Sequence, residues 1–336
     1  MNRQPAQRGA ALLTAMIIVT LIASLAAGMV WQQYRAVQIE AADRARAQST
    51  WILQGALDWA RLILLEDAKE NRKKAVDHLG EPWAVPLAEA RLSTFLAADK
   101  TAATDDEGPE AFLSGSIEDA QSRYNLRALL TGNQVPPIEQ RTLERLCSQA
   151  NAAPGTAALI VTGLRAAFPA AASGASSPTT GASGPLNPNN PTDTAETGPL
   201  QPAGLDQLNW LGLDADTIKR LEPYVVLLPK ATPVNLNTAP REVIAALFDG
   251  VDLASAERIV QSRKAKPLQN MSDATALLPG TVEIGSGRAS VDSSFFIVTG
   301  RLRLDERQLE QRSLVERQGM TMAVLARERI NQLVDR

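Results

Sequence analysis

The side chains that could do chemistry in this chain are few. The one histidine, His78, lies in the polar run KKAVDHLGEP, which indicates a solvated side chain rather than a catalytic base or a metal ligand. The one cysteine, Cys147, follows Leu143 and Leu146 at helical spacing, so we expect a buried thiol, and an intramolecular disulfide is excluded. The sequence shows no serine–histidine–aspartate set, no zinc-ligand spacing and no glycine-rich phosphate loop. We therefore predict a protein that is not an enzyme.

One group of oxygen-bearing side chains could bind a metal ion. Glu118, Asp119 and Asn125 stand close together in SIEDAQSRYN, and Asp292 precedes a predicted strand that returns to the same region. Carboxylate and amide oxygens are the ligands that Ca²⁺ prefers, so these four residues are the predicted calcium ligands. A structural alternative stays open, in which Asp119 caps a helix and Asn125 bonds to the local backbone.

The elements that must position these residues begin with an apolar N-terminal stretch. Ala10 to Trp31 give 22 largely apolar positions. A helix of this length, about 33 Å, can cross a bilayer. Arg3 and Arg8 precede the stretch, which predicts a cytoplasmic N-terminus and an exported remainder of the chain.

Three interpretations of this stretch compete: a secretory signal peptide, an ordinary anchor, and the start of a longer helix. Ser24-Leu25-Ala26 offers a small-residue cleavage site, but the apolar run exceeds the roughly 7–15 residues of a signal peptide. Beyond the span, apolar residues recur at three-to-four spacing from Ile52 to Leu64, and no proline intervenes. We therefore predict one helix that continues from the membrane into the exported domain.

A basic leader ending in Arg8-Gly9, followed by an uncharged apolar run, resembles the N-terminus of type IV pilins and pseudopilins. The resemblance implies that a prepilin peptidase cuts the Gly9–Ala10 bond and that the new N-terminus, Ala10, is methylated. Most pilins carry a glutamate at the fifth mature position, which pairs with the terminal amine of a neighbouring subunit; here that position is Thr14. An unpaired charge is unfavourable in hydrocarbon. A subunit that begins a filament can dispense with it, so Thr14 indicates a filament tip.

Small residues in the apolar run indicate how the helix meets its partners. Small side chains let neighbouring helices approach closely in a membrane. The residues predicted for this assembly helix are Leu12, Thr14, Ala15, Ala23 and Gly28.

The exported part begins and ends with strand patterns. EAFLSGSIEDA precedes a long insert, and three strands separated by polar turns follow it, with clear alternation from Val298 to Leu304. Polar residues line one side, which suits a one-sided antiparallel sheet packed on the helix. We predict an α+β fold of this kind, which is also the pilin body.

The insert, from about 120 to 285, has a helical pattern in two halves. The stretch 168–204 divides them; it has two charges and no apolar periodicity, so we expect a disordered loop. The halves open with Asn125-Leu126 and Asn235-Leu236, which predicts a repeat of helical modules.

The second half also resembles a helix-hairpin-helix unit, and this gives an alternative function, that of a membrane-anchored DNA-binding protein of DNA uptake. In such units a glycine-rich hairpin offers backbone N–H groups to a phosphate. Here the hairpin is Asp249-Gly250-Val251-Asp252, whose two carboxylates would repel a phosphate. The net charge of −3 points the same way. We predict no nucleic-acid partner.

The leader, the long helix, the inserted helical halves and the paired Asn-Leu motifs together resemble the general secretion pathway protein K family, the minor pseudopilins of type II secretion systems. The resemblance implies an inserted all-α domain of two sterile-alpha-motif-like, helix-hairpin-helix-like modules. It implies a place at the pseudopilus tip with minor pseudopilins I, J and H, above the major pseudopilin, where the protein nucleates assembly for export of folded proteins across the outer membrane. It also implies an inner-membrane anchor, a periplasmic domain and calcium binding.

The predicted parts are the leader (1–9), the transmembrane and assembly helix (10–31), the amphipathic helix with the first strands (32–119), the first module with its loop (120–225), the second module (226–285) and the C-terminal strands (286–336).

Overall fold

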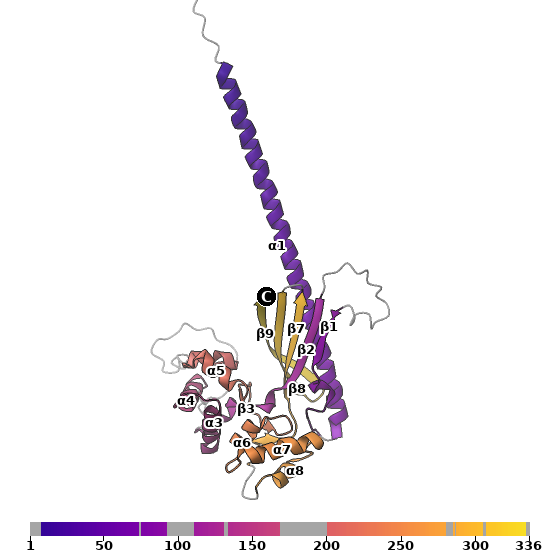
Figure 1. The fold of residues 1–336 in the computed structure, drawn as a ribbon, viewed down its shortest axis with the longest axis vertical. Helices are drawn as coiled ribbons and strands as arrows, with labels where there is room; N and C mark the ends of the chain where they lie inside the picture. Colours follow the sequence, from indigo (N-terminus) through magenta and orange to yellow (C-terminus); the bar gives the residue numbers. More distant parts are fainter. Residues whose placement is uncertain are drawn as a thin grey trace, which may run out of the picture. The chain divides into compact units, whose positions relative to one another are not determined.

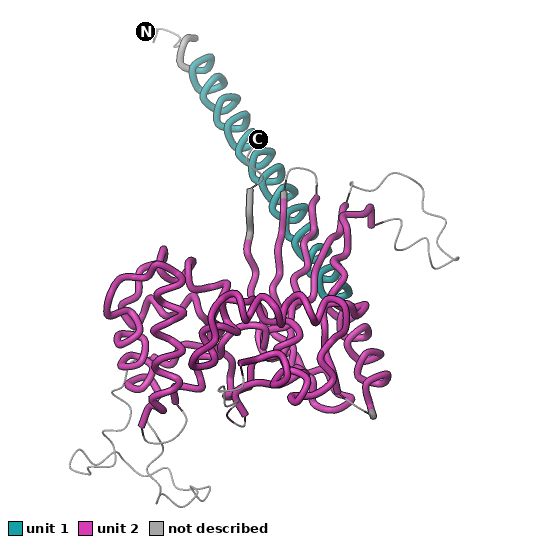
Figure 2. The backbone as a smooth tube through the Cα atoms, turned by 60° about the horizontal axis from the view of Figure 1, so that its bottom comes forward, with its two compact units in different colours: residues 1–56 teal, residues 57–336 magenta. Residues whose placement is uncertain are grey.

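The computed structural model of this protein describes residues 8–73, 75–92, 111–130, 134–168, 200–279, 285, 287–304 and 307–333. Two compact units are distinguished, residues 1–56 and residues 57–336 (Figure 2). Residues 1–7 of the predicted leader, and residues 169–199 of the predicted disordered loop, lie outside the described part.

The first element is the long helix α1 (Arg8–Glu70, 63 residues), as predicted from the apolar pattern. Its N-terminal part is apolar enough to cross a membrane, with a mean hydropathy of 2.3 over its most apolar window. The hydroxyls of Thr14, Thr20 and Ser24 each donate to the carbonyl oxygen three residues earlier. These hydroxyls are therefore satisfied within the helix, which suits a hydrocarbon surrounding.

The second unit contains a five-stranded sheet in the order β1-β2-β7-β8-β9, and every neighbouring pair is antiparallel. Its strands are β1 (Leu87–Arg91), β2 (Ala111–Asp119), β7 (Phe295–Leu304), β8 (Arg307–Gln318) and β9 (Thr321–Leu333). The three C-terminal strands are the three that the alternation predicted. Position 115 of β2 requires glycine, because the backbone of β7 lies close to it. A Cβ atom there would lie 2.7 Å from the carbonyl oxygen of Thr299.

One face of the sheet is covered by the C-terminal part of α1. Leu57, Ala60 and Leu64, spaced three and four apart, are buried in one cluster with Phe296 and Val315 of the sheet. This spacing places all three on one side of the helix. The predicted α+β fold, a long N-terminal helix packed on an antiparallel sheet, is confirmed.

A helical insert interrupts the sheet between β2 and β7. Figure 1 shows its helices gathered at the end of the sheet where β2 ends and β7 begins. The helices are α3 (Pro137–Gln149), α4 (Thr156–Ala167), α5 (Ala215–Leu221), α6 (Arg241–Leu247), α7 (Leu253–Ala265) and α8 (Met271–Leu277). Among the described residues, the 3₁₀ helices are η1 (Asn71–Lys73), η2 (Pro82–Ala84), η3 (Ala120–Ser122), η4 (Leu126–Leu130) and η6 (Leu205–Leu211).

Side chains fix where several of these helices begin. Asp214, Asp252 and Asn270 stand before α5, α7 and α8, and each accepts a backbone N–H three residues further on. Such capping satisfies an amide that has no partner inside the helix.

Each half of the insert is closed by a short parallel strand pair. β3 (Tyr124–Asn125) pairs with β4 (Val225–Val226), and β5 (Val234–Asn235) pairs with β6 (Ala289–Ser290). The two halves nevertheless share one buried apolar cluster, which includes Leu146 of α3 and Ile259 of α7. Cys147 lies in this cluster, and burial, with the nearby charge of Glu144, raises the pKa of its thiol to about 11. The prediction of a buried cysteine is confirmed.

Candidate functional site

The two Asn-Leu motifs occupy matching places in the halves of the insert. Asn125 ends β3, and its side-chain oxygen accepts the backbone N–H of Arg127 at 3.1 Å. Asn235 ends β5, and its side-chain oxygen accepts the backbone N–H of Asn237 at 2.9 Å. Asparagine favours this local turn, so the repeat in the sequence corresponds to a turn that occurs twice.

The side chain of Asn125 is fully engaged by the protein. Its oxygen also accepts the N–H of Leu228 at 3.2 Å, and its amide donates to the carbonyl of Lys230 at 2.7 Å and to the Thr232 hydroxyl at 3.0 Å. Both acceptor and both donor positions of the amide are thus used. These hydrogen bonds agree with the alternative stated for Asn125, in which its side chain bonds to the local backbone.

Asp119 is the centre of a buried hydrogen-bond network. Its Oδ1 accepts the N–H of Gln121 at 2.7 Å, which caps η3. Its Oδ2 accepts from the Thr238 hydroxyl at 2.5 Å, the Ser293 hydroxyl at 2.6 Å and the Asn235 amide at 3.0 Å. Burial raises the pKa of Asp119 to about 6, although these hydrogen bonds act in the opposite direction. The carboxylate therefore joins the end of β2 to the second half of the insert.

Asp77 and Arg317 extend this network toward the sheet. Asp77 Oδ2 accepts the backbone N–H of Ser293 at 2.7 Å and a short hydrogen bond from Arg317 Nη2. Arg317 Nη2 also donates to the Ser293 carbonyl at 2.5 Å, and the Asn235 amide donates to the Asp77 carbonyl at 3.1 Å. We call Asp77, Asp119, Asn235, Thr238, Ser293 and Arg317 the polar junction.

The remaining predicted calcium ligands are Glu118 and Asp292. Glu118 is exposed on the strand position next to Asp119 and forms an ion pair with Arg123 at 2.6 Å. Asp292 is half-buried, and burial, with the charge of Asp77, raises its pKa. Calcium binding by the four predicted residues stays a prediction.

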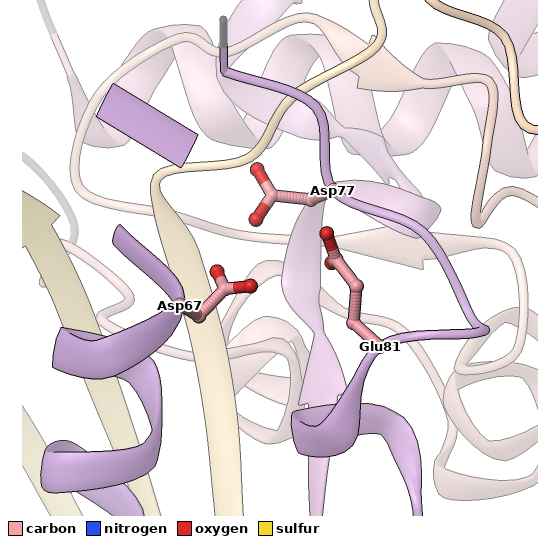
Figure 3. Close-up of side chains that lie close together, drawn as sticks. All are labelled: Asp67, Asp77 and Glu81. Atoms are coloured by element: carbon pink, nitrogen blue, oxygen red, sulfur yellow. The ribbon is translucent and has the colours of Figure 1, made fainter. Parts of the chain in front are cut away.

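A different group of carboxylates lies together. Asp67 near the end of α1, Asp77 in the following loop and Glu81 before η2 are all buried, and each offers an oxygen within 4.8 Å of the others. Figure 3 shows the three carboxylates pointing toward one another. We call these three residues the acid cluster, which could hold an ion.

The groups around the acid cluster compensate only part of its negative charge. Arg317 Nη1 donates to Asp67 Oδ2 at 2.8 Å, and Glu81 Oε2 accepts from Trp83 Nε1 at 2.6 Å. Burial, followed by the charges of Glu81 and Asp77, raises the pKa of Asp67 to about 7. One guanidinium does not balance three buried carboxylates.

His78 lies beside this cluster. It is half-buried, whereas the sequence indicated a solvated side chain. Its Nδ1 accepts the N–H of Gly80 at 3.1 Å, and its Nε2 lies 3.8 Å from Glu81 Oε1. The acid cluster could not be recognised in the sequence, because its three acids do not have the spacing of a known ligand motif. They come together because α1 ends at Glu70, after Asp67 and before Asp77.

The predicted assembly residues lie on the N-terminal part of α1. Leu12, Thr14, Ala15, Ala23 and Gly28 are all exposed within their unit. Apolar side chains cover this whole stretch, from Leu12 at 67% exposure to Trp31 at 63%. A helix that is apolar on every side needs a lipid or protein surrounding. Gly9 and Ala10 fall within α1, and cleavage between them stays a prediction.

The hairpin between α6 and α7 forms ion pairs with another helix of the insert. Gly250 has φ +82°, the left-handed conformation that glycine favours. Asp249 pairs with Arg141 at 2.8 Å and with Arg145, both on α3, and hydrogen bonds from these arginines lower its pKa. The hairpin thus contacts the first half of the insert.

Comparison with known proteins shows which family the chain belongs to. Two models described as type II secretion system protein K match residues 122–230 and 234–292, which together make up half of the chain. The chain belongs to the type II secretion system protein K family.

Two relatives of this protein K family member match along nearly the whole chain. Protein K of Pseudomonas aeruginosa is 28% identical, with 96% of this chain and 92% of the relative covered. Protein K of Klebsiella pneumoniae is 27% identical, with 96% of each covered.

A solved structure has the same fold. It is a chain of the GspK–GspI–GspJ complex from the type 2 secretion system of enterotoxigenic Escherichia coli, with a TM-score of 0.61 and 20% identity. The match covers 87% of this chain and 99% of that chain. The predicted resemblance is confirmed: the chain is a protein K minor pseudopilin. The protein K family is structural rather than catalytic, which confirms that the chain is not an enzyme.

Removing the carboxylate at the centre of the polar junction should destabilise the fold strongly. Asp119→Ala leaves the hydroxyl of Ser293 without its acceptor and removes one acceptor each from the Thr238 hydroxyl and the Asn235 amide. We expect the free energy of unfolding to fall by about 2–5 kcal/mol, as measured by urea unfolding of the full chain in detergent.

The matched control is the neighbouring acid. Glu118→Ala removes an exposed ion pair and should lower the free energy of unfolding by less than about 1 kcal/mol. Equal losses in the two variants would contradict the central place given to Asp119.

Proposed function

We propose that this protein is the pseudopilin at the tip of the pseudopilus, where it nucleates assembly for the export of folded proteins across the outer membrane. The observation that carries the proposal is the helical insert between β2 and β7, which adds a large helical body to a pilin-like helix and sheet. A subunit stacked above such a body would collide with it, so the top position is the one that accommodates it.

The N-terminal part of α1 is the proposed membrane anchor and assembly surface. Its uncharged apolar run, preceded by Arg3 and Arg8, supports a single span of the inner membrane with a cytoplasmic N-terminus and a periplasmic C-terminal domain. Small residues such as Ala15, Ala23 and Gly28 would allow close contact with partner helices.

The proposed partners are the other minor pseudopilins, of types I, J and H, together with the major pseudopilin and the prepilin peptidase. The solved relative with this fold was determined as a complex with GspI and GspJ, which supports the first two of these. Thr14, in place of a charged residue, supports a position with no subunit above.

We propose further that the insert consists of two sterile-alpha-motif-like modules. The repeated asparagine turn and the two closing strand pairs support two units of related construction. Their common apolar core and the pairing of Asp249 with Arg141 and Arg145 support a role of the hairpin as scaffold rather than as a DNA contact.

Calcium enters this proposal as a structural ligand of the exported domain. Two sets of oxygen atoms are available for it. One is the predicted set of Glu118, Asp119, Asn125 and Asp292, and the other is the acid cluster.

Processing by the prepilin peptidase should produce a defined mature N-terminus. We expect intact-mass measurement of the membrane-extracted protein to show Ala10 as the first residue, carrying a methyl group. Gly9→Val should leave the precursor uncut, because a branched side chain hinders an extended residue in a narrow active site. Gly28→Val, far along the helix, should be processed normally. An N-terminus at Ala27 would mean ordinary signal-peptide cleavage and would refute the assignment of a pilin-type leader.

The tip position can be tested directly on pseudopili. An epitope inserted between residues 169 and 199 and labelled with gold should mark one end of each sheared filament, because a single tip subunit has no equivalent position along the length. The same epitope on the major pseudopilin should label filaments throughout. Gold distributed along filaments through the tagged protein K would rule out the tip position.

A further inference from the structure

Strand β2 is paired along only part of its outer side. On its inner side it pairs with β7 over its whole length, but on its outer side β1 accompanies it only as far as Gly115. Figure 1 shows β1 as the short outermost strand beside β2. Within the described part of the chain, no backbone hydrogen bond reaches residues 116–118 from the outer side. Successive residues of a strand direct their N–H and C=O groups alternately to its two sides, so this stretch presents unpaired backbone groups.

The segment that runs beside this stretch has no N–H group to offer it. The N–H groups of Ala84 and Val85 donate to the carbonyl oxygens of Glu81 at 3.0 Å and Pro82 at 3.3 Å, within the turn of η2. Pro86, the residue before β1, has no N–H group, so it cannot extend the pairing of β1 with β2. The outer edge of β2 stays open for this reason.

A groove with a volume of about 510 Å³ lies along the open edge, and this is a size typical of ligand-binding sites. The open stretch from Ser116 to Asp119 is about 13 Å long at the rise of a β-strand. The groove has an apolar wall and several hydroxyl groups. The wall includes Leu79, Ala84 and Pro86, and the hydroxyls include those of Ser116, Ser122 and Thr238.

Both ends of the groove are bounded by the protein. At one end β1 begins at Leu87, opposite Gly115. At the other end the insert begins, and its residues Ser122 and Thr238 line the groove. The long edge of another sheet cannot lie along so short a stretch. A single extended segment with about four residues in the groove matches its length.

The charged groups of the groove are neutralised within the protein. Glu118 pairs with Arg123 at 2.6 Å, and Arg301 pairs with Glu310 at 2.8 Å. The carboxylate of Asp119 accepts the hydrogen bonds of the polar junction. No charge is left over for a charged ligand to pair with, and burying an unpaired charge is unfavourable. The groove therefore favours a segment with uncharged side chains.

The opposite edge of the sheet is protected against an added strand. Strand β9 pairs with β8 through a register shift between Leu314 and Val315. Three successive residues of β9, Arg327, Glu328 and Arg329, are charged and exposed. Bulges and charged side chains are the means by which proteins keep an edge strand from pairing with another chain. The outer edge of β2 has an open groove instead.

We propose that the groove binds an extended, uncharged segment of a partner protein, which adds a short strand to the outer edge of β2. In this mode of recognition, main-chain hydrogen bonds supply the affinity and the surroundings of alternate side chains supply the specificity. The proposal does not depend on the tip position or on calcium.

The two faces of β2 indicate the side chains of the bound segment. Ile117 packs against the buried cluster between α1 and the sheet, whereas its neighbours Ser116 and Glu118 belong to the other face. Side chains of an added strand alternate between the same two faces. The segment should therefore alternate apolar and small polar side chains.

The test uses the full chain in detergent and a short, capped, fluorescein-labelled peptide of alternating valine and serine. Fluorescence anisotropy should show saturable binding. The same peptide methylated at every backbone nitrogen keeps its side chains but donates no hydrogen bond, so it should bind at least about tenfold more weakly. Bound peptide should slow the hydrogen exchange of residues 111–119 and leave that of β9 unchanged.

Two exposed leucines provide matched variants. Leu79, 57% exposed, lines the groove, and Leu325, 42% exposed, lies on β9 at the other edge of the sheet. Leu79→Glu should weaken peptide binding at least about tenfold, because it replaces an apolar contact by a charge, and Leu325→Glu should leave binding unchanged.

Three results would overturn the proposal: no saturable binding, equal affinity for the methylated peptide, or a greater loss in Leu325→Glu than in Leu79→Glu. Dimerisation of the chain that Leu79→Glu abolishes would assign the groove to a second copy of this protein, and would overturn it as well.

Discussion

The arrangement of the exported domain depends on satisfying the polar groups at the point where the insert leaves and re-enters the sheet. Strands β2 and β7 are hydrogen-bonded neighbours, with Asp119 opposite Phe296, so the insert starts and ends at one place. That place is buried, and unpaired polar groups there would be unfavourable. The carboxylate of Asp119 resolves this by accepting from Asn235, Thr238 and Ser293 at once. A large helical body is thereby attached to the sheet through hydrogen bonds rather than through a tether.

This attachment explains how one chain combines two tasks. The N-terminal part of α1 is apolar on all sides and presents no charge, as an anchor and assembly helix requires. The C-terminal part of α1 has one buried face, and Leu57 and Leu64 pack on the sheet. The insert does not break the sheet, because β2 pairs with β7 along the whole of β2, from Ala111 to Asp119, despite the interruption.

Much of this could be predicted from periodicity. The long helix, the three C-terminal strands, the buried Cys147 and the helical insert follow from spacing and composition, since these signals are local. The surroundings of the acidic side chains could not be predicted in the same way. Asp119 and Asn125 look like free ligands in the sequence, yet their oxygens are used by amides and hydroxyls from residues more than 100 positions away. The acid cluster is the opposite case. Asp67, Asp77 and Glu81 form no sequence motif, yet they lie together because the chain turns back after the end of α1.

The most direct measurement is native-state hydrogen exchange of the full chain. The amides of Gln121, Asn237 and Ser293 donate to side chains of the polar junction and its asparagine turn. If the junction joins insert and sheet into one cooperative body, these amides should open with the same free energy as Val298 in the middle of β7. Exchange of the three amides at a much lower free energy than Val298 would show that the insert opens on its own, and would contradict this account.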